Sequence, residues 1–139
     1  MIQIKKLSKI FQTEEVETKA LSEVSITINQ GDFVTIMGAS GSGKSTLLNI
    51  VGLLDSASSG SYQLLNQEMV GLKEQQKSKF RKENIGFVFQ NFNLIDELSV
   101  YDNIELPLIY NNVSASERRF KVEKIADRLG ISHRLKHFP

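Results

Sequence analysis

The sequence contains no cysteine and carries almost no net charge, and both absences exclude classes of function. Without cysteine the chain can form no disulfide, no thiolate nucleophile and no cysteine metal site. Its 17 lysines and arginines nearly balance its 16 aspartates and glutamates, which leaves a formal net charge of +1. No basic excess points to nucleic acid and no polybasic block points to anionic lipid. We therefore predict no nucleic-acid partner.

Long apolar runs are also missing. No stretch approaches the roughly 20 residues that a membrane-spanning helix needs. The N-terminus, MIQIKKLSKIF, alternates apolar and polar residues and lacks the apolar run of a signal peptide. With 139 residues, 40% of them apolar, the chain suits one ordinary globular domain. We expect a soluble, intracellular-type chain that meets a membrane only through a partner.

Hydrophobic patterning predicts strands early in the chain. Residues 1–10 and 21–28 alternate apolar and polar side chains, as half-buried strands do. The turn that follows them needs a positive φ angle at Gly31. Residues 33–37 (FVTIM) form a nearly continuous apolar run, and residues 85–89 (IGFVF) resemble them. Such runs are typical of strands covered on both faces, as in a parallel sheet.

Helices are predicted at several later positions, with a short strand at residues 62–65. Residues 45–54 carry a broad apolar stripe, and residues 73–82 are charged and helical in pattern.

Two capping patterns mark further helices. Ser99 and Asp102 form a capping box that begins a helix, which Pro107 should end or kink. Ser114 and Glu117 repeat the pattern before a helix that continues to about residue 129.

A glycine-rich loop separates the apolar run 33–37 from the helix predicted at 45–54. Residues 38–45 read GASGSGKS and satisfy the pattern G-x-x-x-x-G-K-[ST]. Glycines let the backbone approach a phosphate, and consecutive N–H groups form a nest for an anion. The helix start adds unpaired N–H groups and a positive dipole end. The alternative, a flexible Gly/Ser linker, has no need of the flanking patterns.

The loop is therefore predicted to hold the phosphates of a nucleotide. Lys44 should reach the β- and γ-phosphates, the Ser45 hydroxyl should ligate Mg²⁺, and Thr46 should donate to the α-phosphate. The predicted phosphate-binding residues are Gly38, Ser40, Gly41, Ser42, Gly43, Lys44, Ser45 and Thr46.

Two longer segments resemble the nucleotide-binding domain of ABC transporters. They read IMGASGSGKSTLLNIVGLLD and IGFVFQNFNLIDELSVYDNIELPL, and the resemblance extends from Met1 to Pro139. The GLLD and FVFQNFNLI…NIELPL parts look like the lipoprotein-releasing and macrolide-export subgroup. The resemblance implies an α/β fold with an N-terminal antiparallel β subdomain and a partial phosphate-loop NTPase core in residues 1–92. It also implies that residues 93–139 start the α-helical subdomain.

The resemblance assigns further nucleotide-binding residues. Phe11 matches an aromatic on which adenine stacks; the usual residue is tyrosine, but phenylalanine keeps the ring face and a stacking contribution of about 1–3 kcal/mol. Val16 is placed in the same site. From the pattern alone, a core aromatic in an amphipathic strand is the favoured interpretation of Phe11. Gln90 matches the glutamine that ligates Mg²⁺ or holds the attacking water. The alternative is that Gln90 is an ordinary polar residue at the end of a strand.

The chain departs from the family at one turn. Asn66 replaces a common glycine and should tolerate a left-handed turn.

The resemblance also implies partners and a location. Phe92, Leu94 and Ile95, together with Leu98, match a groove that receives a short helix of a transmembrane permease. The open alternative is that these side chains pack under the helix that follows. The family further implies ATP and Mg²⁺ as cofactors, a second copy of the ATPase, and a cytoplasmic position on the inner face of the membrane.

Four parts of the family pattern are not found in residues 1–139: the LSGGQ signature, the Walker B aspartate, the catalytic glutamate and the switch histidine. We therefore expect the intact protein to hydrolyse ATP as a dimer, whereas these residues alone bind ATP weakly and turn it over poorly. An open apolar sheet edge should favour dimers, domain swapping or marginal stability. Two alternatives stay open: a non-catalytic nucleotide-binding module, and a small phosphate-loop kinase with Arg118 and Arg119 in its lid.

Overall fold

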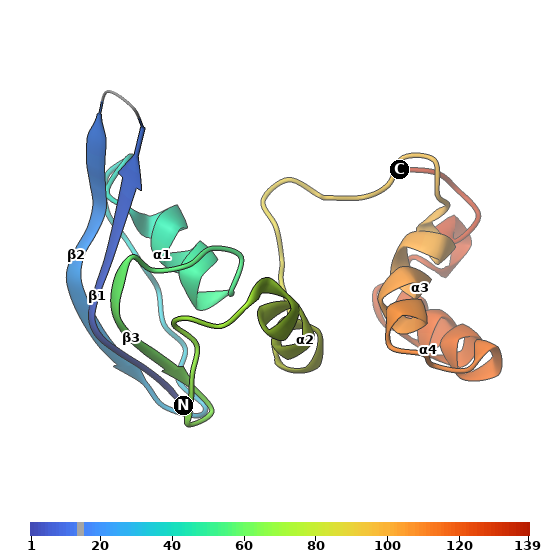
Figure 1. Cartoon of the computed structure of the whole chain (residues 1–139). Helices are drawn as coiled ribbons and strands as arrows, with labels where there is room; N and C mark the ends of the chain where they lie inside the picture. The colour runs from blue at the N-terminus through green and yellow to red at the C-terminus, as the bar shows by residue number, and fades with distance from the viewer. Residues whose placement is uncertain (14–15) are drawn as a thin grey trace. The chain divides into compact units, whose positions relative to one another are not determined.

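Antiparallel strands at the start of the chain form one sheet (Figure 1), in a computed structural model that describes residues 1–13 and 16–139. The strands are β1 (Ile2–Gln12), β2 (Glu17–Ile28), β3 (Ser59–Leu64) and β4 (Gln67–Glu68). Their order across the sheet is β2-β1-β3-β4, and every neighbouring pair is antiparallel. The predicted N-terminal antiparallel subdomain is therefore confirmed.

A two-residue turn joins β3 to β4. Leu64 pairs with Gln67 across the turn, so Leu65 and Asn66 occupy its two central positions, with φ angles of 51° and 66°. Both angles positive is the geometry that matches the right-handed twist of the strands. The predicted left-handed conformation of Asn66 is confirmed, as is the positive φ of Gly31 at 90°.

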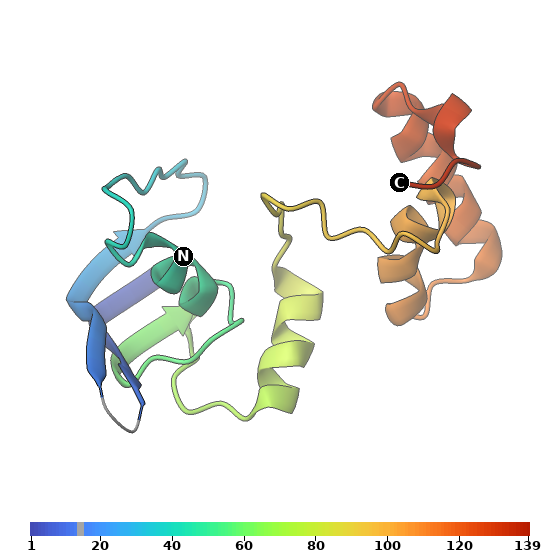
Figure 2. The same ribbon diagram turned by 90° about the horizontal axis from the view of Figure 1, so that it is seen from above.

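Helix α1 (Lys44–Val51) lies against one face of the sheet, as Figures 1 and 2 both show. The buried residues of this core are Ile4, Leu7, Leu21, Leu47, Ile50, Leu53, Tyr62 and Met69. Tyr62 also fixes the helix end, because its hydroxyl donates to the Val51 carbonyl at 2.7 Å. Burial raises the pKa of Tyr62, so this phenol remains a donor. Helix and sheet are thereby locked together.

Helix α2 (Glu74–Asn84) is tied to the segment that follows α1. The ammonium of Lys77 is buried, and it donates to the Ser56 hydroxyl at 2.7 Å and pairs with Glu74 at 3.1 Å. Arg81 donates to the Leu53 carbonyl. Sheet, α1 and α2 belong to one compact unit, Met1–Phe87.

The second compact unit is Val88–Pro139, and it is helical. Helices α3 (Val100–Tyr110) and α4 (Ala115–Arg128) lie side by side and are joined by an ion pair of 2.8 Å between Arg118 and Glu105. A short 3₁₀ helix, η1 (Ser132–Arg134), follows them. That this unit starts the helical subdomain of the family, with a boundary at residues 92 and 93, stays a prediction.

The helix ends confirm one of the two capping predictions and correct the other. The Ser99 hydroxyl accepts from the Asp102 amide and the Asp102 carboxylate accepts from the Ser99 amide, as predicted. Of the two outcomes predicted for Pro107, an end to the helix is wrong, because α3 continues through Pro107 to Tyr110. Ser114 does precede α4 but makes no capping bond.

Glu117 explains the missing second capping box. Its carboxylate pairs with Lys121 one turn further along α4, at 2.7 Å, instead of reaching back to the helix start. An ion pair of this spacing on the helix surface competes directly with the capping geometry.

The two apolar runs predicted as parallel strands, residues 33–37 and 85–89, are not strands in this structure. Phe33 is 96% and Met37 85% exposed. A run of β-forming side chains becomes a strand only when a neighbouring strand pairs with its backbone, and the sheet formed by β1 to β4 does not include residues 33–37. The prediction of strands at these positions is therefore wrong for this structure.

Candidate functional site

The glycine loop reverses the chain just before α1. Gly38, Gly41 and Gly43 have φ angles of 155°, 77° and 86°, a region that side-chain-bearing residues rarely occupy. At Gly43 space is limiting as well, because a Cβ atom there would lie 2.5 Å from the Ala20 carbonyl oxygen of β2. The loop can therefore reach this position against the sheet only with glycine at residue 43.

Helix α1 starts without a side-chain cap. Gly43 occupies the N-cap position, no side chain accepts a hydrogen bond from the first turn, and that turn holds no acidic residue. The first N–H groups of a helix have no partner within the helix, and they carry the positive end of its dipole. The start of α1 thus offers donors and positive potential to an anion.

Lys44 folds back over the loop. Its ammonium donates to the carbonyl oxygens of Gly38 at 2.9 Å and Ala39 at 2.6 Å, with the Ser42 hydroxyl at 3.4 Å. The positive charge of Lys44 therefore lies on the glycine loop itself. A phosphate that binds to this loop would meet the ammonium and the first amides of α1 together.

The hydroxyl groups predicted to bind phosphate or Mg²⁺ belong to the glycine loop and to the first turn of α1. Ser45 and Thr46 are the second and third residues of α1, and Ser45 is exposed. Ser40 and Ser42 are exposed in the loop itself. A serine hydroxyl is a hard oxygen donor of the kind that Mg²⁺ accepts, so the residue type at position 45 fits the predicted ligand.

Phe11 lies near the end of β1 with its ring exposed, and it is not among the buried core residues. The alternative reading of Phe11 as a core aromatic is therefore wrong. Phe11 pairs with Thr18 of β2, two residues from Ala20, whose carbonyl meets Gly43. Two residues of a strand span about 7 Å, so the ring lies near the glycine loop.

Val16 begins the return into β2. Its carbonyl accepts from the Thr13 amide at 2.9 Å, and its own amide donates to the Thr13 hydroxyl at 3.1 Å. The Val16 side chain is exposed, as a residue that contacts a ligand must be. Its predicted contact with the nucleotide stays a prediction.

Gln90 and the predicted permease-contacting residues belong to the second unit, whereas the glycine loop belongs to the first. Gln90 lies in an exposed bend. Phe92, Leu94 and Ile95 are exposed too, so the alternative that they pack under the following helix is wrong for these three. Leu98, in contrast, is partly buried.

Asn103 is a residue that the sequence analysis missed. From α3 its side-chain oxygen accepts from the Ile95 amide at 2.9 Å, and its amide group donates to the carbonyls of Ile95, Leu98 and Ser99 at 3.0 Å each. It therefore fixes the end of the segment that presents Leu94 and Ile95. An asparagine in the first turn of a helix after an irregular loop was the only available signal.

Lys9 and Asp55 were missed as well. Lys9 of β1 pairs with Asp55, which follows α1, at 2.7 Å, and its ammonium lies 4.8 Å from the centre of the Phe11 ring. Burial raises the pKa of Asp55, but hydrogen bonds from Lys9 and from the Ser56 amide outweigh it and hold that pKa below its ordinary value. No sequence signal connects residues this far apart.

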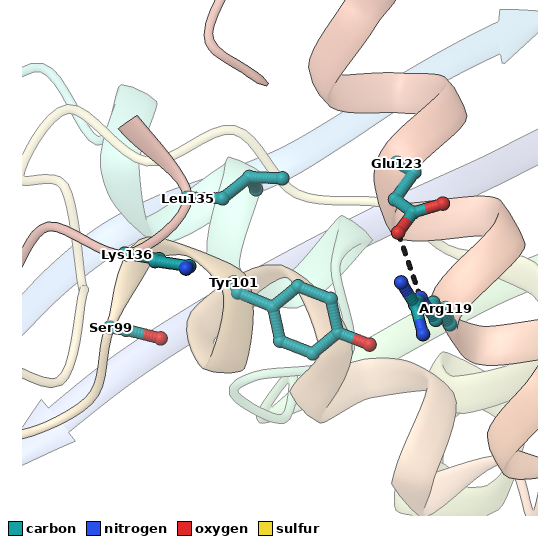
Figure 3. Close-up of a pocket in the computed structure, with 6 residues that line it drawn as sticks. All are labelled: Ser99, Tyr101, Arg119, Glu123, Leu135 and Lys136. Atoms are coloured by element: carbon teal, nitrogen blue, oxygen red, sulfur yellow. Dashed lines mark hydrogen bonds and ion pairs between the residues drawn. The ribbon is translucent and has the colours of Figure 1, made fainter. Parts of the chain in front are cut away.

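A hollow of about 600 Å³ lies wholly within the second unit (Figure 3). Figure 3 shows the Tyr101 ring reaching towards the Arg119–Glu123 ion pair of 2.9 Å. Burial, and then the charge of Glu105, raise the pKa of Tyr101. The lining residues are Ser99, Tyr101, Arg119, Glu123, Leu135 and Lys136. Apart from Arg119, which the kinase alternative places in its lid, none of them was predicted as a site residue.

The described residues include neither a cluster of metal-binding side chains nor a membrane-spanning helix. Within residues 1–13 and 16–139, no group of three or more His, Cys, Asp or Glu side chains could hold a metal ion. No helix in the described part of the chain is long and apolar enough to cross a bilayer.

Comparison with known proteins places the chain among ABC transporters. A family model described as ABC transporter matches residues 21–139. The whole chain is 39% identical to the macrolide export ATP-binding/permease protein MacB of Azoarcus sp. (strain BH72), of which it covers 21%. It is also 39% identical to the uncharacterized ABC transporter ATP-binding protein YknY of Bacillus subtilis (strain 168), of which it covers 60%.

Solved structures agree with these sequence matches. A dimeric structure of a post-hydrolysis state of the ATP-binding cassette MJ0796, bound to ADP and Pi, matches all of this chain with a TM-score of 0.91 and 38% identity. The chain spans 62% of that cassette. The predicted α/β fold class and the predicted likeness to macrolide-export proteins are both confirmed. Since the family model, the relatives and the cassette all match through the glycine loop and the helices after it, the chain belongs to the ABC transporter family.

Proposed function

We propose that this chain binds Mg-ATP through the loop of residues 38–46, as the nucleotide-binding part of a transport ATPase. The carrying observation is the Lys44 ammonium, which lies on the carbonyls of Gly38 and Ala39 beside the uncapped start of α1. The Lys44 ammonium and the uncapped amides at the start of α1 therefore lie together at the glycine loop. The post-hydrolysis cassette that this chain resembles holds ADP and Pi, the products expected of ATP hydrolysis.

Each loop residue has a distinct part in the proposed site. The amides of Gly41, Gly43 and Lys44 surround the phosphates, and the ammonium of Lys44 leaves the loop carbonyls for the β- and γ-phosphate oxygens. Bound Mg²⁺ would neutralise charge on those oxygens. Ser45 and Gln90 would hold it, since a hydroxyl and an amide oxygen both suit this ion.

Hydrolysis belongs to the longer protein in this proposal. Lys44 and Gln90 are the catalytic residues that the chain contributes; Lys44 balances the charge of the transferred phosphoryl group, and Gln90 orients the attacking water. We expect a second copy of the ATPase to complete the site. The chain of 139 residues should bind ATP weakly and hydrolyse it poorly by itself.

The exposed residues Phe92, Leu94 and Ile95 form the proposed docking surface for a transmembrane permease. Three large apolar side chains on one segment, whose backbone Asn103 holds at Ile95, suit the apolar face of a short helix. The MacB relative is an ATP-binding and permease protein in one chain, which supports a permease as the partner. The chain would then act on the cytoplasmic face of the membrane.

The ion pairs of two arginines count against the kinase alternative. Arg118 pairs with Glu105 at 2.8 Å and Arg119 pairs with Glu123 at 2.9 Å, so a phosphate would have to displace a carboxylate from each guanidinium. Titration with AMP provides a direct check, because a kinase with a nucleotide acceptor should bind AMP and a transport ATPase should not.

The proposed function is tested by the Lys44→Ala variant of the full chain, titrated with a fluorescent ATP analogue in the presence of Mg²⁺. We expect affinity to fall at least ten-fold, because a charge-assisted contact worth about 1.5–3 kcal/mol is lost. Lys5→Ala, which removes an exposed lysine of β1, is the matched control and should bind like the parent. Equal affinity of the Lys44→Ala variant and the parent would refute the proposed site.

A further inference from the structure

Lys9 makes three contacts that its sequence position does not explain. Its ammonium donates to an Asp55 carboxylate oxygen at 2.7 Å and to the Ser56 carbonyl at 2.8 Å. The same ammonium lies 4.8 Å from the centre of the Phe11 ring, which is within the range of a cation–π contact. The Lys9 side chain is only 12% exposed, so it is held rather than solvated.

The segment that carries both acceptors of Lys9 is tied to β1 at Ser58. The Ser58 amide donates to the Ser8 carbonyl at 2.9 Å, and the Ser58 hydroxyl accepts from the Ile10 amide at 3.0 Å. These bonds on either side of residue 9 clamp the segment after α1 alongside the strand. A loose surface ion pair contributes little order, but here the backbone bonds determine where the ammonium lies.

The Phe11 ring therefore contacts the Lys9 ammonium and remains partly exposed to solvent. Lys9 occupies a ring face, yet 45% of the Phe11 surface remains exposed. Its strand partner Thr18 lies two residues from Ala20, and Ala20 contacts the glycine loop at Gly43. The exposed part of the ring is thus within reach of a base whose phosphates lie in that loop.

We propose that Lys9 is a positioning residue for the base of the bound nucleotide: fixed by Asp55, its ammonium holds one face of Phe11 so that the other face stacks on the base. This inference rests on the proposed function. A ring ordered before binding loses less conformational freedom when the base arrives. A cation on one face also withdraws electron density from the ring, which reduces the repulsion between stacked π faces.

The experiment separates the contribution of the base to binding from that of the phosphates. The full chain is titrated with Mg-ATP and, in a second series, with inorganic triphosphate and magnesium, because triphosphate has no base. Lys9→Met removes the charge and keeps the length of the side chain; we expect ATP to bind about three- to ten-fold more weakly and triphosphate to bind as before. Lys9→Arg keeps a cation and should bind ATP as the parent does. Lys5→Met on the same strand is the control, and both of its affinities should match those of the parent.

Two further variants keep the test decisive if Lys9→Met folds poorly. Asp55→Asn frees the lysine without removing it and should also weaken ATP binding but not triphosphate binding. In a Phe11→Ala background, Lys9→Met should cost nothing more, because the two residues act as one unit. Unchanged ATP affinity in both Lys9→Met and Asp55→Asn, or equal losses for the two ligands, would overturn the inference. A parent that binds neither ligand would instead overturn the proposed function.

Discussion

At the scale of single residues, Lys44 shows how the loop holds its shape before a ligand arrives. Its ammonium bonds to two neutral carbonyl oxygens, of Gly38 and Ala39. Hydrogen bonds between an ammonium and a phosphate are charge-assisted on both sides and about twice as strong as neutral ones. We therefore expect the lysine to exchange carbonyl for phosphate oxygens on binding, with little change in the loop backbone.

Within the glycine loop, Gly43 is the residue whose replacement should cost most. An alanine there would need a left-handed backbone, at a φ angle of 86°, and would bring its Cβ to 2.5 Å from the Ala20 carbonyl oxygen. We expect Gly43→Ala to lower the free energy of unfolding by about 2–4 kcal/mol in urea denaturation.

Gly71→Ala is the matched control for Gly43→Ala. Gly71 has a similar φ angle of 82°, but no atom lies within 4 Å of a Cβ built on it. Only the backbone strain remains, so the cost should be about 1 kcal/mol. If the two variants lost the same stability, the close approach of the loop to β2 would be wrong.

At the scale of elements, short irregular segments are held by side chains from neighbouring helices and strands. Asn103 of α3 bonds to the backbone of Ile95, Leu98 and Ser99, and Lys9 of β1 bonds to Asp55 and Ser56. Both anchored segments adjoin proposed contact surfaces. These two segments are thus ordered by side chains from outside the segments themselves.

Asn103→Ala should loosen the segment that ends in α3. The Ile95 amide loses its acceptor, and we expect its hydrogen exchange to accelerate about five-fold, in line with a net loss of roughly 1 kcal/mol per hydrogen bond. Exchange measured by NMR reports this amide directly. Asn111→Ala, which removes only a bond to the Pro107 carbonyl, should leave the Ile95 amide unaffected. Unchanged exchange at Ile95 in both variants would contradict the anchoring role.

Asp55 should make the stability of the chain depend on pH in the acid range. Its pKa in the folded state lies below the ordinary value of 3.8, so its contribution is complete above the unfolded pKa and is lost as pH falls through the folded one. The difference in unfolding free energy between the parent and Asp55→Asn should therefore be constant from about pH 7 to about pH 5 and shrink below about pH 4.

Urea denaturation at a series of pH values measures this difference. The pKa values of Glu68 and Glu74 are also lowered, so the parent will lose stability in acid for several reasons, and only the comparison with Asp55→Asn isolates Asp55. A difference as large near pH 2.5 as at pH 7 would show that the Lys9–Asp55 pair does not stabilise the fold.

At the scale of the whole molecule, the main unusual feature is the largely exposed apolar run of residues 33–37. Phe33 and Met37 are largely exposed within a run of β-forming residues. Such a run is an available edge for pairing with another chain. We expect the parent to self-associate with rising concentration in sedimentation velocity, and the double variant Phe33→Ser, Met37→Ser to stay monomeric to higher concentration.

Phe120→Ser tests whether any exposed aromatic would have the same effect. Phe120 is exposed on α4, outside the apolar run, and its removal should leave the association unchanged. A parent that stayed monomeric at all concentrations and melted sharply at high temperature would contradict the expected open edge.

The sequence by itself determined the features that depend on neighbouring residues. The glycine loop, the start of α1, the Ser99 cap and the left-handed turn at Asn66 were all predicted, because φ preferences and amide directions are set within a few residues. Membership of the family followed from the same local motifs.

Only the tertiary structure decided which distant residues meet. Lys9 pairs with Asp55 across 46 positions, and no pattern along the chain specifies that contact. Likewise, residues 33–37 have the composition of a strand, but strand formation depends on a partner elsewhere, and the described sheet is β2-β1-β3-β4. Backbone preference is local, whereas pairing and burial depend on where the rest of the chain lies.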